Sequence, residues 1–105
     1  MPTEEQLKLT AIDLYSKFEI ETDIHTDYVL LKHVLSTRIR HLIDTNVEQF
    51  MQALYRIDVS EQKVKQVLAE KPLDEAIEMI AEMIIERQLQ KVITRQKYQQ
   101  PKGDW

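Results

Sequence analysis

The sequence predicts an all-α fold: a single-domain helical bundle of four to five helices with a long C-terminal helix. Three observations indicate this class. The chain of 105 residues has one glycine, three prolines and no cysteine, so residues that form tight turns are scarce. It contains no Asn-Gly or Asp-Gly dipeptide, which is the usual signal of a β-hairpin. Its apolar residues instead recur at the 3.6-residue spacing that is typical of amphipathic helices.

The first helix is expected to begin after Thr3. Thr3 and Gln6 have the spacing of a capping box, in which each side chain accepts a hydrogen bond from the other residue's backbone. The apolar face of this helix consists of Leu7, Ala11, Leu14, Tyr15 and Phe18. The pattern ends in the acidic stretch 19–23, so a connection is expected there.

The second helix is expected to run from about Ile24 to Ile43. Its apolar stripe consists of Ile24, Tyr28, Leu31, Leu35, Ile39 and Leu42. Polar residues with good N-cap chemistry precede the stripe, and Thr22, Asp23 and Thr26 are all candidates for the cap.

A third helix is expected from Asp44 or Thr45 to Ile57. Thr45 and Glu48 have the spacing of a second capping box. The pattern leaves open whether this helix is separate from the second or whether the two form one kinked helix.

Two further helices complete the expected bundle. Ser60 is the expected N-cap of a short helix from Glu61 to about Ala69. Pro72 ends that helix and suits the first turn of the last one, where its missing N–H does no harm. The last helix is expected from Leu73 to Tyr98, so residues 1–98 form the bundle domain and residues 99–105 a C-terminal tail.

The first half of the last helix is apolar around more than half of its circumference. A helix of this kind is covered by protein on most sides, so it is either the centre of the bundle or the contact with a second subunit. After Ile85 the apolar residues move to a different side of the helix. This shift favours an oligomer interface, and the alternative is a helix that extends past its own bundle. The expected interface residues are Met79, Met83, Leu89, Val92 and Ile93.

Glutamates form one line along the last helix, at positions 75, 78, 82 and 86. Helical metal proteins use inward-facing glutamates with a Glu-x-x-His motif or a second acidic pair, and neither is evident here. The histidines His25, His33 and His41 recur every eight residues, which turns them apart around a helix. We therefore expect a solvated glutamate line, no metal ligands and no cofactor.

Basic residues supply the candidate binding site. Arg87, Lys91 and Arg95 follow one line near the end of the last helix, where cations complement the helix dipole or bind a phosphate or acidic partner. Arg38 lies on the apolar side of the second helix, either paired with an acid or anchoring a ligand, and His41 lies near it. The acids considered for Arg38 are Asp44, Asp58 and Glu86.

The remaining sequence features limit the function. The net charge of −4 argues against a dedicated nucleic-acid-binding protein, although residues 47–57 and 61–69 have helix-turn-helix proportions. No serine lies in a recognisable nucleophile motif, so no catalytic residue is assigned. The acidic N-terminus does not resemble a signal peptide, and no apolar run is long enough to span a membrane.

We therefore interpret the chain as a non-enzymatic, cytoplasmic protein-interaction or structural protein that acts as a homodimer. An unidentified protein partner is a further option. One alternative is a nucleic-acid or polyanion-binding module that uses the basic C-terminal helix. A second is a small helical metal-dependent enzyme.

Overall fold

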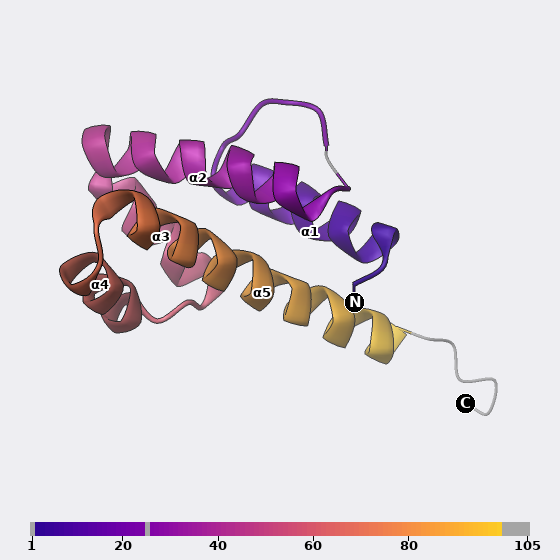
Figure 1. Ribbon diagram of the computed structural model, residues 1–105. Helices are drawn as coiled ribbons and strands as arrows, with labels where there is room; N and C mark the ends of the chain where they lie inside the picture. Colours follow the sequence, from indigo (N-terminus) through magenta and orange to yellow (C-terminus); the bar gives the residue numbers. More distant parts are fainter. Residues whose placement is uncertain (1, 25, 100–105) are drawn as a thin grey trace.

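The structure, a computed structural model, describes residues 2–24 and 26–99, and this part of the chain forms an all-α bundle (Figure 1). The five helices are α1 (Glu4–Lys17), α2 (Tyr28–Thr45), α3 (Val47–Ile57), α4 (Glu61–Glu70) and α5 (Leu73–Gln99). The fold class and the long last helix are therefore confirmed. Among the helices described, none is long and apolar enough to cross a membrane.

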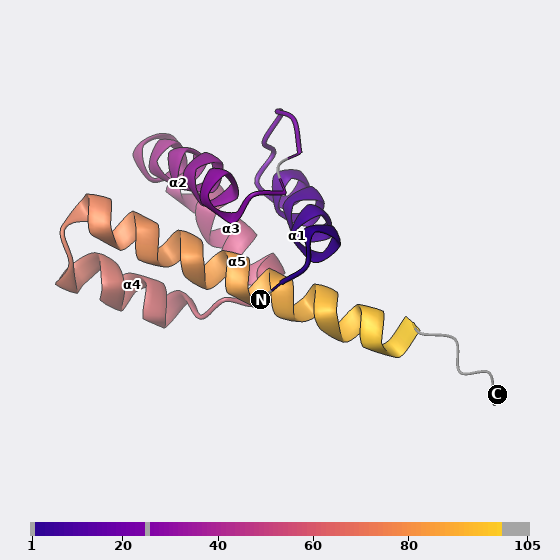
Figure 2. The same cartoon turned by 45° about the vertical axis from the view of Figure 1, so that its right-hand side comes forward.

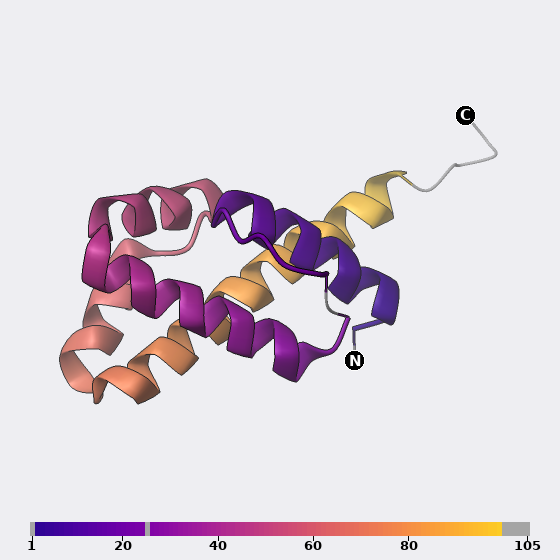
Figure 3. The same cartoon turned by 90° about the horizontal axis from the view of Figure 1, so that it is seen from above.

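Helix α5 is the axis of the bundle. Each of the other four helices packs against it, and Figure 3 shows it crossing beneath α1 and α2. The buried side chains in its first half, which form the wide apolar surface, are Ala76, Ile77, Ile80, Ala81, Ile84 and Ile85. The breadth of this apolar surface is thus explained within one chain, because neighbouring helices cover several sides of α5.

Helix α1 begins and ends as its sequence predicts. The Thr3 hydroxyl accepts from the Gln6 backbone N–H at 3.0 Å, and the Gln6 side chain accepts from the Thr3 N–H at 3.0 Å, which confirms the capping box. The helix ends at its C-cap, Phe18, and Glu19 then takes a left-handed conformation with φ of 55°. The chain beyond Glu19 returns along the bundle, so α1 and α2 begin at the same end (Figure 3).

The start of α2 differs from the expectation. The helix begins at Tyr28, and its N-cap is Asp27, whose carboxylate accepts from the N–H groups of Val29 at 2.8 Å and Leu30 at 3.3 Å. The candidate caps Thr22, Asp23 and Thr26 are wrong, because Ile24 lies before the helix although its spacing fits the apolar stripe.

Helices α2 and α3 are separate. Asn46 breaks the helical path with φ of −158° and ψ of 72°, and its side chain accepts from the Gln49 N–H at 3.1 Å. The expected capping box at Thr45 is therefore wrong. The Thr45 hydroxyl instead donates to the His41 carbonyl at 2.7 Å, within the last turn of α2.

The remaining connections are made without glycine. Asp58 ends α3 in a left-handed conformation with φ of 67°. Ser60 caps α4 as expected, accepting from the Lys63 N–H at 3.2 Å. Pro72 directly precedes α5, and its carbonyl accepts from the Ala76 N–H at 2.8 Å. Helix α5 ends at Gln99, and the rest of the expected tail lies outside the described residues.

Candidate functional site

Two of the candidate binding residues on α5 donate hydrogen bonds to groups at the C-terminus of a neighbouring helix, α3. Arg87 donates from Nη2 to the Asp58 carboxylate at 3.0 Å and from Nε to the Asp58 carbonyl at 3.3 Å. Lys91 donates from Nζ to the Arg56 carbonyl at 3.4 Å. Cations at a helix C-terminus complement its dipole, so these residues stabilise the end of α3 rather than their own helix.

Burial and like charge both act on Lys91. Burial is the larger cause and lowers the pKa of its ammonium group, and the nearby charges of Lys17 and Arg87 lower it further. The Asp58 carboxylate raises this pKa and so offsets part of the shift.

The third basic residue, Arg95, belongs to a polar seam between α1 and α5. Its Nη2 donates to Asp13 Oδ2 at 2.8 Å, and the same oxygen accepts from Gln88 Nε2 at 2.9 Å. Gln88 is 2% exposed, and its Oε1 accepts from Lys17 Nζ at 3.1 Å. The candidate cations of α5 are therefore engaged in contacts inside the chain.

The seam residues Asp13, Lys17 and Gln88 are not among the candidates from the sequence. One signal could have identified Gln88. It lies four residues after Ile84 and four before Val92, so it is a polar residue in a buried stripe. A buried amide needs hydrogen-bond partners, and that need points to polar residues on a neighbouring helix.

Arg38 closes the C-terminus of α1. Its Nε donates to the carbonyl of Phe18 at 2.8 Å. Arg38 and the exposed His41 both line a groove of about 500 Å³. Within the described chain Arg38 forms no ion pair with the acids considered for it, and Asp58 pairs with Arg87 instead. A backbone carbonyl thus takes the place of the expected carboxylate.

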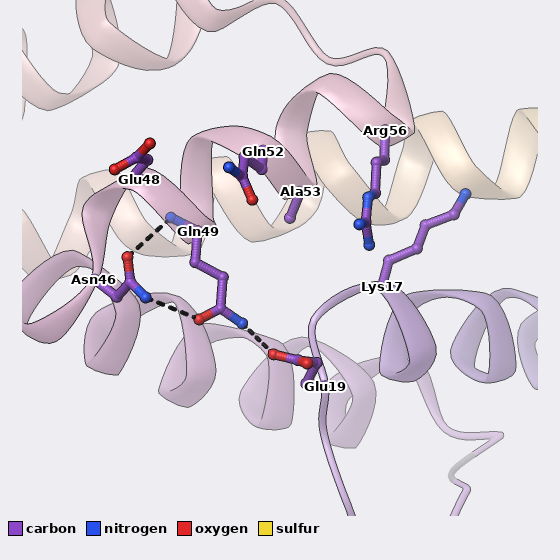
Figure 4. A pocket seen from close by; sticks show the side chains of 8 residues that line it. All are labelled: Lys17, Glu19, Asn46, Glu48, Gln49, Gln52, Ala53 and Arg56. Carbon is purple, nitrogen blue, oxygen red and sulfur yellow. Dashed lines mark hydrogen bonds between the residues drawn. The ribbon is translucent and has the colours of Figure 1, made fainter.

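A polar groove of about 350 Å³ lies between the end of α1 and α3 (Figure 4). Lys17 and Arg56 lie at one end, whereas Glu19 and Glu48 lie toward the other. Its polar side chains bond to one another: Asn46 donates to Gln49 at 3.2 Å, and Gln49 donates to Glu19. Because two acids and two bases share the groove, it carries no net charge that would attract an ion.

The part of the chain that the structure describes contains no group of three His, Asp or Glu side chains able to hold a metal ion. The glutamates at positions 75, 78, 82 and 86 are all exposed, as a solvated line requires.

The expected interface residues differ in how far they are buried. Met79 and Met83 are half-buried, and Met83 packs against the core of its own chain. Val92 is fully buried, so the expectation that it faces a partner is wrong: α5 turns this side chain inward. Leu89 is half-buried and Ile93 is 42% exposed, so both have surface available to a partner.

Leu89 and Ile93 lie on what we term the outer face of α5. This face consists of Glu82, Glu86, Leu89, Gln90, Ile93 and Lys97, which share one side of the helix at its 3.6-residue period. Beside it is an apolar hollow of about 510 Å³, lined by Pro2, Leu7, Tyr28, Ile85, Glu86 and Leu89. Burial of Tyr28, with the nearby charges of Glu82 and Glu86, raises the pKa of its phenol.

Comparison with protein-family models, with curated proteins and with solved structures finds no significant match to this chain.

Proposed function

We propose that the chain is a non-enzymatic, cytoplasmic helical interaction protein that acts as a homodimer, and that the outer face of α5 carries the contact. The observation that supports this most is the position of that face. The last turns of α5 lie beside α1 (Figure 2), where Arg95 bonds to Asp13. Ile93 is 42% exposed on this part of α5. A helix segment gains most of its stability from packing an apolar face, so a second protein surface would complete this one.

The contacts of the basic residues on α5 weaken the support for the polyanion-binding alternative. It depends on Arg87, Lys91 and Arg95, and each of these donates to an acceptor on α1 or at the end of α3. Binding a phosphate would have to replace those contacts.

The domain boundaries of 1–98 and 99–105 remain part of the proposal.

Light scattering on the purified chain and two variants tests the proposal. Ile93→Asp places a charge at the centre of the proposed contact. Ile12→Asp is a matched control, because Ile12 is 41% exposed and lies on α1. We expect wild type and Ile12→Asp to have the mass of a dimer, and Ile93→Asp to have the mass of one chain. A single-chain mass for all three proteins would contradict the proposal.

A further inference from the structure

The order of side chains along the outer face of α5 suggests how two copies would pack. Glu82 and Glu86 come first, Leu89 and Ile93 follow, and Lys97 comes last. All of them are exposed except the half-buried Leu89. The face therefore changes from acidic through apolar to basic over little more than four helical turns.

This order makes the face complementary to itself in one direction only. Two such helices in parallel place glutamate beside glutamate and lysine beside lysine, which is unfavourable. Two antiparallel helices place the acidic end of each beside the basic end of the other. Placing Glu86 opposite the partner's Lys97 puts the two-fold axis midway, between Lys91 and Val92.

The same alignment brings apolar groups together. It places the partner's Ile93 opposite Gln90, which directly follows Leu89 and lies about one helical turn after Glu86. Leu89 and Glu86 both line the apolar hollow. Val29 lies at the start of α2, next to Tyr28 of that hollow, and is 69% exposed. A second copy would thus place an exposed isoleucine beside a hollow lined by Tyr28 and Ile85.

We propose that the dimer forms by antiparallel packing of the outer faces of α5, with Glu86 of each copy beside the partner's Lys97 and Ile93 beside the partner's apolar hollow. The proposal rests on the proposed function, since it specifies the geometry of that dimer. A C2 interface of this kind uses one surface patch twice, so every contact occurs in duplicate.

Charge reversal tests the pairing. Glu86→Lys and Lys97→Glu each place like charges together in the antiparallel dimer, twice over, and we expect the dissociation constant to rise on the order of tenfold. The double variant restores opposite charges and is expected to recover wild-type affinity. Glu48→Lys, which makes the same charge change on α3, is the control and is expected to leave the dissociation constant unchanged.

Cross-linking supplies an independent measure of direction. The chain has no cysteine, so a single introduced one reacts alone. With the axis between Lys91 and Val92, the two copies of residue 90 are offset by about 4.5 Å along the helices, and the two copies of residue 82 by about 28 Å. We expect a short bis-maleimide to link Gln90→Cys dimers and not Glu82→Cys dimers.

The outcomes separate the two proposals. A single-chain mass for the wild type overturns the proposed function and the packing together. Two results for a dimeric wild type overturn the antiparallel packing and leave the proposed function in place. One is a dissociation constant that the single charge reversals do not change, and the other is equal cross-linking through residues 82 and 90.

Discussion

At the scale of single residues, the buried polar groups decide how the outer helices attach to α5. Gln88 bonds to Asp13 and to Lys17, so one buried amide joins α1 to α5 at two points. The partners of Arg87, Lys91 and Arg95 lie 29, 35 and 82 residues away in the chain. Spacing along one helix identifies the basic line, but it holds no information about acceptors this distant. The line of basic residues on α5 could therefore be predicted from the sequence, whereas the acceptors to which these residues donate could not.

Two buried hydroxyl groups among the described residues, those of Tyr15 and Ser36, have no hydrogen-bond partner, and the first yields a prediction. Tyr15 is buried, and among the described residues its hydroxyl has no hydrogen-bond partner. An unsatisfied buried polar group costs about 1–3 kcal/mol, so Tyr15→Phe is expected to raise the free energy of unfolding by about 1 kcal/mol. Urea denaturation at neutral pH measures the change. Tyr55→Phe is the control, because Tyr55 is 87% exposed and should give no change. A loss of stability in Tyr15→Phe would show that the hydroxyl is bonded.

The same residue affects the response to alkali. Burial raises the pKa of the Tyr15 phenol above its ordinary value of about 10. The unfolded chain therefore releases this proton at a lower pH than the folded chain. The contribution of this difference to the free energy of unfolding is fully present below the pKa that Tyr15 has in the unfolded chain. It is lost as the pH rises through the pKa that Tyr15 has in the folded chain. We expect Tyr15→Phe to lose less stability than wild type above pH about 10.

At the scale of elements, the capping residues define the turns, since no described residue is a glycine. The caps at Thr3 and Ser60 could be predicted because each is followed at once by an apolar helical pattern. The start of α2 could not, because Ile24 continues the apolar stripe outside the helix and only the backbone shows this. At the start of α3, Thr45 and Asn46 are adjacent polar residues that could both act as the N-cap. Asn46 is the cap because the backbone leaves the helical conformation at this residue.

Substitution at these two adjacent residues tests that choice. Asn46→Ala removes the acceptor for the Gln49 N–H and is expected to lower the free energy of unfolding by about 1 kcal/mol. Thr45→Ala removes an exposed hydroxyl and is expected to change it by less than about 0.5 kcal/mol. Asn46→Asp keeps a cap acceptor and should retain most of the stability. Equal losses from the two alanine variants in chemical denaturation would contradict the assignment of the cap.

At the scale of the whole molecule, α5 has two roles along its length. Its first half is enclosed by the other helices, which accounts for apolar residues on most of its sides. In its second half a different side of the helix faces the bundle: Val92 is buried, whereas Ile93 is 42% exposed. The sequence predicts a helix buried on most sides, but periodicity cannot distinguish burial by the chain's own helices from burial by a second copy. The three-dimensional packing shows that the chain's own helices bury the first half, whereas Ile93 on the outer face is 42% exposed.

Sedimentation equilibrium of the wild-type chain tests the central claim most directly, because it reports mass without any substitution. A dimer held by the outer face of α5 predicts twice the mass of one chain, with a return toward the single-chain mass on dilution. A single-chain mass at every concentration would contradict the account, since the exposed end of α5 would then have no second copy to cover it.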